Sequence, residues 1–308
     1  MSVLCPVYDG ERHLRESVAS IRGQSFADWE LILLDDGSRD ASPRLCAELA
    51  RGDGRIRFER HPENRGLGAA MTTLCRLARG LYLAVQEQDD VSSPRRLEQE
   101  VAVLEREPEV GLVSGIAEWL DAEGRSTALF PGLLARSEAY PEEPADMVRF
   151  LYLEQCKVVN AGCMFRRAVL EDPRIRFDPE ARMSVDWQFF LHLAHRWRIH
   201  GLNEVVVRMH RGHPTLTRRK ELQFREARRC LHRIRDTYAG DPESPITGSL
   251  YRQALAYQLV LEGRHRGRLR GLGLLGRAAL LHPTSAAPWR SMADLAKRAW
   301  SRLASGTA

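Results

Sequence analysis

The sequence predicts an α/β fold, in which a mostly parallel sheet is flanked by helices and followed by a helical C-terminal extension. Three observations predict it. Short apolar runs alternate with amphipathic segments through residues 1–120, the links between them are short, and the pattern from about Thr217 is nearly all helical and rich in arginine. Strand–helix alternation with short links is typical of parallel sheets. Right-handed crossovers then bring the strand ends to one edge, where such folds bind ligands.

The elements of the first half follow from apolar periodicity and from helix end signals. Leu14, Val18 and Ile21 fall on one helical face. Ser42 with the following proline begins a second helix, and Gly80 ends a third. The expected strands are residues 3–8, 29–34, 56–61, 81–85 and 110–120, and the expected helices are residues 12–24, 42–54, 66–80 and 93–107.

The pattern after Leu120 is less regular. We expect a turn at 121–126 and a loop at 131–144, then helices at 145–155 and 184–197 and strands at 158–167 and 198–210. The predicted domains are a catalytic domain at 1–217, with a nucleotide-binding half at 1–120 and an acceptor half at 121–217, and a basic helical extension at 218–308.

Composition sets limits on the class of protein. The 308 residues are 44% hydrophobic and 28% charged, which is typical of a soluble globular protein. The net charge of +5 fits phosphate-bearing ligands, nucleic acid or an anionic membrane surface, and does not choose among them. The six cysteines form no C-x-x-C pair and are expected to be reduced thiols. Neither a signal peptide nor an apolar run of about 20 residues occurs, so we expect a cytoplasmic protein.

Acidic side chains follow two of the predicted strands. Asp35 and Asp36 end the second strand, and Glu87, Asp89 and Asp90 follow the fourth. Carboxylates that lie close together repel each other unless a cation sits between them, and hard divalent ions prefer oxygen ligands. These acids therefore indicate a site for a metal and a phosphorylated ligand. The alternative is that the segment from Asp89 to Pro94 is only a loop with a helix cap.

The opening "CPVYDGERHLRESVASIRGQSFADWELILLDDGSRD" resembles that of glycosyltransferase family 2, which has the GT-A fold. The resemblance continues through "ENRGLGAAM", "LARGLYLAVQEQDD", "NAGCMFRRAVL", "VDWQFFLHLA" and "VRMHRGHPTLT", in the order of the family, over about residues 1–217. It implies an inverting, metal-dependent transfer from a nucleoside-diphosphate sugar to a hydroxyl of a glycan or glycoconjugate. Bacterial surface polysaccharide is the implied setting.

The resemblance also implies roles for individual residues. Asp186 matches the catalytic base. Glu87 and Asp89 match the acids that bind a divalent metal, Mn²⁺ or Mg²⁺, and His210 matches a histidine that contacts the metal or the diphosphate. The implied nucleotide-sugar contacts are Pro6, Tyr8, Glu11, Asp35, Asp36, Asn64, Gly68 and Asp90.

Three departures from the family pattern open an alternative. Glu87 replaces the usual Asp, Val185 replaces the Glu before the catalytic Asp, and Met71 stands where an Arg is common. A nucleotide-sugar-binding protein of impaired activity is therefore the second hypothesis. Asp186 could also be only a helix cap and His210 a surface histidine. An aspartyl-phosphate enzyme using "LLDDGS" lacks the lysine that it would need at a later strand end, and "GLG" at 66–68 lacks the third glycine of a dinucleotide loop.

The C-terminal extension mixes arginine with Leu272, Leu274, Leu275, Leu280 and Leu281, and adds Trp289 and Trp300. Basic amphipathic helices of this kind can lie on an anionic membrane, where a lipid-linked glycan acceptor would be found. The alternative is that they pack on the protein and expose a solvated arginine face. The expected partners are thus the sugar nucleotide and a glycan or lipid-linked acceptor, without nucleic acid. The expected location is the cytoplasm, and the membrane hypothesis adds peripheral contact with the inner face of the plasma membrane.

Overall fold

The computed structural model of the protein describes residues 1–308 except 156, 211–219, 267 and 295–308, and describes the backbone alone for 268–270. The chain divides into two compact units, Met1–Thr215 and Leu216–Ala308. The tail of the "VRMHRGHPTLT" motif, the predicted boundary at 217 and Trp300 lie outside the described residues.

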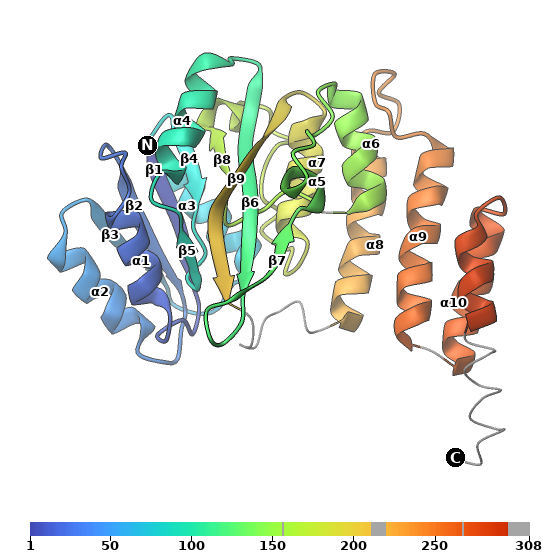
Figure 1. Ribbon diagram of the computed structural model, residues 1–308, viewed down its shortest axis with the longest axis horizontal. Coiled ribbons are helices and arrows are strands. Elements are labelled where there is room, and N and C mark those ends of the chain that lie inside the picture. Colours follow the sequence, from blue (N-terminus) through green and yellow to red (C-terminus); the bar gives the residue numbers. More distant parts are fainter. Residues whose placement is uncertain (156, 211–219, 267, 295–308) are drawn as a thin grey trace, which may run out of the picture. The chain divides into compact units, whose positions relative to one another are not determined.

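The first unit is built on a nine-stranded sheet (Figure 1). The strands are β1 (Ser2–Val7), β2 (Glu30–Asp36), β3 (Ile56–His61), β4 (Tyr82–Val85), β5 (Asp90–Ser92), β6 (Val110–Leu120), β7 (Ser126–Phe130), β8 (Met164–Arg166) and β9 (Arg198–His210). The strand order is β3-β2-β1-β4-β8-β6-β9-β5, and β7 pairs with β6. The pairs among β1–β4, and the β6–β9 pair, are parallel, whereas β8 is antiparallel to both β4 and β6.

Helices connect the strands of this unit. They are α1 (Leu14–Arg22), α2 (Ser42–Gly52), α3 (Leu67–Leu77), α4 (Arg96–Arg106), α5 (Gly132–Ala135), α6 (Pro144–Glu154), the 3₁₀ helix η1 (Arg167–Glu171) and α7 (Val185–Ala194). Side chains alternate along a strand, and Val3, Cys5 and Val7 of β1 pack in one core cluster with apolar residues of α1, α2 and α4. These helices therefore cover one face of the sheet, and α3 packs against β1 and β2.

The structure confirms the predicted strand–helix alternation through β6, and corrects three expectations. The expected strand at 158–167 is reduced to β8, which inserts between β4 and β6. Residues 90–92 form β5 against β9, so the alternative of a simple loop with a helix cap between Asp89 and Pro94 does not describe them. Residues 126–130 form β7 against the end of β6, and the expected loop at 131–144 contains α5. β5 and β8 depend on partners that are remote in the sequence, and β7 is largely exposed, so local periodicity carries little signal for these strands.

The second unit is helical, with α8 (Lys220–Thr237), α9 (Gly248–Arg266) and α10 (Arg268–Leu281). Its core joins Leu259 and Val260 of α9 to Leu275 and Ala278 of α10. Leu280 of α10 is 84% exposed, and Leu272 and Trp289 are also exposed. The apolar residues of the extension are thus divided between a helix–helix core and the surface. None of the described helices is long and apolar enough to cross a bilayer.

Candidate active site

The candidate site lies where β1, β2 and β4 end. Tyr8 follows β1, Asp35 and Asp36 end β2, and Glu87 comes two residues after β4. Because β1 pairs in parallel with both β2 and β4, the carboxyl ends of the three strands meet at one edge. This edge is the ligand-binding edge of a parallel α/β sheet.

Three carboxylates converge after β4. One oxygen each from Glu87, Asp89 and Asp90 lie within 4.8 Å of one another. Asp90 is 4% exposed, and its Oδ2 has no hydrogen-bond partner within the described part of the chain. An acceptor that is buried and left unpaired costs about 1–3 kcal/mol, and a bound cation would satisfy it. Carboxylate oxygens at this spacing are the ligands that Mn²⁺ or Mg²⁺ prefers, so these residues fit a divalent metal.

The electrostatics of the cluster agree with that fit. Burial, and then the charge of Asp89, raise the pKa of Glu87 to about 7. Burial, followed by the charges of Glu87 and Asp89, raises the pKa of Asp90 well above its ordinary value, although Arg96 opposes the shift. Glu87 and Asp90 therefore lie where a second negative charge is costly. A divalent cation would reverse this penalty, because it would be the largest charge in the site.

Asn160, in the turn before β8, is a site residue that sequence reasoning missed. Its Nδ2 donates a hydrogen bond of 2.9 Å to Oε1 of Glu87. Its Oδ1 is buried without a hydrogen-bond partner among the described residues. The amide thereby holds the longer carboxylate that replaces the usual Asp. The sequence feature that could have identified Asn160 is its place as a polar residue directly after the apolar pair Val158–Val159.

Arg96 is a fully buried cation behind the acidic cluster. Its guanidinium donates to the carbonyl oxygens of Val85 and Cys163 at 2.8 and 3.1 Å and to Oγ of Ser92 at 2.9 Å. Its Nε donates to the buried Glu100 at 3.2 Å. One side chain of α4 thus joins the end of β4, β5 and the residue before β8, which are the segments that hold the cluster.

Gln88 ties the loop after β1 to the acidic cluster. Its Oε1 accepts a hydrogen bond of 2.8 Å from the backbone N–H of Tyr8, and its Nε2 donates to the carbonyl of Tyr8 at 3.0 Å. A Cβ on Gly10 would lie 2.2 Å from Oε1 of Gln88, so this close approach favours glycine. Tyr8 is 40% exposed and accessible to a ligand. Glu11 accepts a hydrogen bond of 2.8 Å from the N–H of Ala41, just before α2.

The two acids of β2 already have partners inside the protein. Asp35 is fully buried and pairs with Nε of Arg60 at 2.9 Å. Asp36 accepts hydrogen bonds from the backbone N–H groups of Arg65 and Gly66 and lies 2.6 Å from Nδ1 of His61. Asp36 thus anchors the loop between β3 and α3.

Two of the expected nucleotide contacts lie after β3. Asn64 lies in the loop and is exposed. Gly68 belongs to the first turn of α3, within the predicted helix at 66–80. A Cβ at Gly68 would lie 1.9 Å from the carbonyl oxygen of Asp178, so this glycine permits close packing of backbone on backbone. Met71 is a core residue of α3, at 1% exposure, and the departure at this position therefore lies in the core.

Asp186 and His210 belong to elements that reach the region of the acidic cluster. The negative charge of Asp186, in the first turn of α7, raises the pKa of Glu87 after the larger effects of burial and Asp89. His210 ends β9 directly after Met209, which pairs with Asp90 of β5. Its ring stacks on that of His13 at a centroid distance of 6.3 Å. The fold therefore brings Glu87, Asp89, Asp90, Asp186 and His210 to one region. Pro6, in β1, leads toward the same edge.

The sequence model of the family described as "Glycosyl transferase family 2" matches residues 2–172. The chain belongs to glycosyltransferase family 2. Two proteins of Bacillus subtilis (strain 168) that are named as glycosyltransferases are similar to it. EpsE is 42% identical over 107 residues, or 34% of this chain, and EpsH is 28% identical over 197 residues, or 63% of this chain. The chain spans 38% of the length of EpsE and 55% of that of EpsH.

Two solved structures resemble the fold of this glycosyltransferase. The S. aureus TarS 1–349 structure in complex with UDP-GlcNAc has a TM-score of 0.70 and 17% identity, covering 91% of this chain and 80% of that one. The mannosyltransferase PcManGT from Pyrobaculum calidifontis, in complex with GDP-Man and Mn²⁺, has a TM-score of 0.59 and 20% identity, covering 98% and 86%. The predicted GT-A fold is thereby confirmed.

Proposed function

We propose that this glycosyltransferase moves a sugar from a nucleoside-diphosphate sugar to an acceptor hydroxyl, with a divalent metal and with inversion at the anomeric carbon. The observation that carries the proposal is the convergence of Glu87, Asp89 and Asp90 at the ligand-binding edge, with a buried oxygen of Asp90 that lacks a partner among the described residues. The UDP-GlcNAc and GDP-Man bound to the two structural neighbours support this class of donor.

In this proposal Glu87 and Asp89 would hold the metal, Mn²⁺ or Mg²⁺, and His210, at the end of β9, would contact the metal or the diphosphate. A bound divalent cation would stabilise the charge that develops on the leaving diphosphate. Asp90 faces the donor sugar or adds a further oxygen ligand. The nucleotide contacts come from Pro6, Tyr8, Glu11, Asp35, Asp36, Asn64 and Gly68.

Asp186 is the proposed general base. The acceptor hydroxyl loses a proton as it attacks the anomeric carbon, and a carboxylate held opposite the leaving group can take that proton. Its place near Glu87 supports the assignment. A single in-line displacement assisted in this way inverts the anomeric centre.

We further propose that residues 1–217 form the catalytic domain and that the basic helices of 218–308 are an extension. The acceptor would be a glycan or a lipid-linked glycan, in the biosynthesis of bacterial surface polysaccharide. The exposed Leu272, Leu280 and Trp289 support peripheral contact with the inner face of the plasma membrane from the cytoplasm.

The metal assignment is tested by nucleotide binding. Asp89→Ala should abolish Mn²⁺-dependent binding of UDP and GDP in calorimetry, because the metal loses a carboxylate ligand. Asp146→Ala, which removes an exposed carboxylate of α6, is the matched control and should bind as the parent does. Equal affinity in parent and Asp89→Ala would overturn the metal assignment.

Turnover separates the enzyme from a protein that only binds donors. Purified protein is incubated with a panel of sugar nucleotides and Mn²⁺, and free nucleotide and transferred sugar are measured by mass spectrometry. Release of nucleoside diphosphate from one donor supports the transferase. Donor binding without hydrolysis or transfer across the panel would favour the impaired binding protein that Glu87, Val185 and Met71 suggest.

A further inference from the structure

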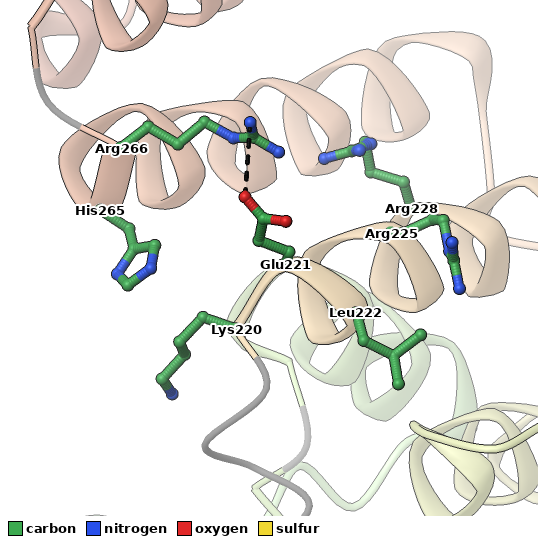
Figure 2. Close-up of a pocket in the computed structure, with 7 residues that line it drawn as sticks. All are labelled: Lys220, Glu221, Leu222, Arg225, Arg228, His265 and Arg266. Carbon is green, nitrogen blue, oxygen red and sulfur yellow. Dashed lines mark ion pairs between the residues drawn. The ribbon is translucent and has the colours of Figure 1, made fainter.

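The second unit contains a cavity of about 750 Å³ between the beginning of α8 and the end of α9 (Figure 2). Four side chains that line it are basic: Lys220, Arg225, Arg228 and Arg266. One is acidic, Glu221. The volume lies within the range of sites for small molecules, about 300–1,000 Å³. The proposed transfer reaction assigns no role to any of these residues.

A buried carboxylate pairs with two of the arginines that line the cavity. Glu262 of α9 is 2% exposed and forms ion pairs with Nη1 of Arg228 and, at 2.8 Å, with Nε of Arg266. Two guanidinium groups share this one carboxylate. When Glu221 and Glu226 are also counted, the four basic side chains of the cavity face three carboxylates, so one positive charge is left in excess. A guanidinium carries five N–H donors. Glu262 accepts hydrogen bonds from only some of these donors. The two ion pairs fix the guanidinium groups, and thereby the directions of the remaining N–H groups.

Figure 2 shows the guanidinium groups of Arg228 and Arg266 directed into the gap between the helices, with Glu221 between them. Nη1 of Arg266 lies 3.7 Å from Glu221, whose side chain is largely exposed. Lys220 donates to Gln223 on the exposed side of α8, whereas Arg225 pairs at 3.4 Å with the buried Glu226. The contact of Lys220 and the pair between Arg266 and the exposed Glu221 contribute little, so an incoming anion can replace them, while Arg225 stays paired with Glu226.

We propose that this cavity binds the phosphate group of a phosphomonoester or a diphosphate. Phosphate oxygens accept hydrogen bonds from several directions at once, which suits two guanidinium forks and a flexible ammonium group from separate helices. The cavity exceeds the volume of a phosphate alone and leaves room for an attached group. The ligand is either a soluble phosphate compound or a phosphorylated lipid headgroup, since both present the same chemistry.

The test uses the full chain and a pair of variants that remove equal charge. Lys220→Gln/Arg266→Gln removes two cations of the cavity, while Glu262 keeps its pair with Arg228 and remains neutralised. Arg229→Gln/Arg277→Gln removes two exposed arginines of α8 and α10 that do not line the cavity. Thermal melting of all three proteins establishes that each is folded. A chelator is present throughout, so that the acidic cluster of the first unit does not bind pyrophosphate through a metal.

Inorganic pyrophosphate is the soluble probe, measured by calorimetry. Vesicles of phosphatidic acid, with phosphatidylglycerol vesicles of equal charge density and phosphatidylcholine vesicles as references, are the membrane probe, measured by co-sedimentation. We expect the cavity variant to lose about tenfold or more in affinity for at least one probe, because each lost charged hydrogen bond is worth about a factor of ten. The control variant should bind as the parent does.

The two arms identify the source of the phosphate. Cavity-dependent binding of pyrophosphate alone indicates a soluble ligand, and cavity-dependent binding of phosphatidic acid vesicles indicates a lipid headgroup. The proposal is overturned if the parent binds neither probe. It is also overturned if the two variants weaken binding equally, since general charge attraction would then explain the result.

Discussion

Glu87 is the residue whose chemistry depends most on a neighbour. Its side chain is one methylene longer than the aspartate of the family pattern, and the amide of Asn160 fixes it at 2.9 Å. A side chain that orients a metal ligand commonly changes metal affinity or activity by 10–100-fold when it is removed. Asn160 is therefore expected to act through Glu87 and not on the substrate directly.

Asn160→Ala should lower the affinity for Mn²⁺ in the presence of UDP by about tenfold, since Glu87 loses its fixed orientation. The measurement is Mn²⁺ titration followed by electron paramagnetic resonance, which does not need turnover. Asn203→Ala, at an exposed position of β9, is the matched control. Unchanged Mn²⁺ affinity in Asn160→Ala would show that the contact with Glu87 has no part in metal binding.

Asp186→Asn keeps the size and hydrogen-bonding shape of the side chain but cannot accept the acceptor's proton. Transfer should fall by about 10²-fold or more, while calorimetric affinity for the nucleotide stays near that of the parent. The comparison of the catalytic rate with donor binding separates the two roles. If the Asp186→Asn variant transfers sugar as fast as the parent, the carboxylate only favours the start of α7.

Among the elements, α4 stabilises the fold through a buried polar side chain as well as through its apolar face. Arg96 projects from its first turn into the core and bonds to β4, to β5 and to the carbonyl before β8. Removing one partner of a buried ion pair leaves the other charge uncompensated, at a cost of about 3–5 kcal/mol.

Arg96→Met should therefore lower the free energy of unfolding by about 3–5 kcal/mol in urea denaturation. Arg96→Met/Glu100→Leu should recover part of that loss, because no buried charge is then left unpaired. Equal stability of the double and single variants would mean that the backbone hydrogen bonds of Arg96, and not its pair with Glu100, account for the effect.

Helix α7 contains a buried histidine that should make stability depend on pH. Burial, with smaller effects from nearby cationic groups, lowers the pKa of His192 to about 4. The unfolded chain binds this proton near pH 6.5, so the stability gained from neutral His192 is complete above that pH and declines as the pH falls toward 4. Relative to His192→Gln, the parent should lose on the order of 2–3 kcal/mol over this range in urea denaturation. Parallel pH profiles of the two proteins would contradict this assignment.

The elements that the sequence predicted are those with a local signal. β2 is apolar on both faces, because the run from Leu31 to Leu34 is apolar at every position. The helix predicted between 12 and 24 repeats its apolar residues at helical spacing. β5 and β7 lacked such a signal, because β5 contains Asp90 and Ser92 and depends on pairing with β9. The contact between Asn160 and Glu87 spans 73 residues, and it exists only because β8 inserts beside β4. No local pattern encodes that insertion.

For the whole molecule, the division into two units predicts that the first unit binds nucleotide and metal without the second. Every residue assigned to the donor and the metal lies within Met1–Thr215. A chain that ends at residue 217 should therefore keep its Mn²⁺-dependent affinity for UDP and GDP, measured by calorimetry beside the full chain. A folded fragment, established by circular dichroism, that fails to bind either nucleotide would show that the second unit completes the donor site.

The paired hydrogen bonds between Gln88 and Tyr8 have a thermodynamic consequence. They connect the backbone beside the proposed base pocket to the loop that carries the carboxylates. A ligand that orders one of these two loops also restricts the other loop. The second ligand then has less conformational entropy to remove when it binds. Nucleotide and metal should then bind with positive cooperativity, and linkage requires that each raise the affinity of the other by the same factor. Binding of a sugar nucleotide would in this way raise the affinity of the site for the cation, and either ligand alone would bind weakly.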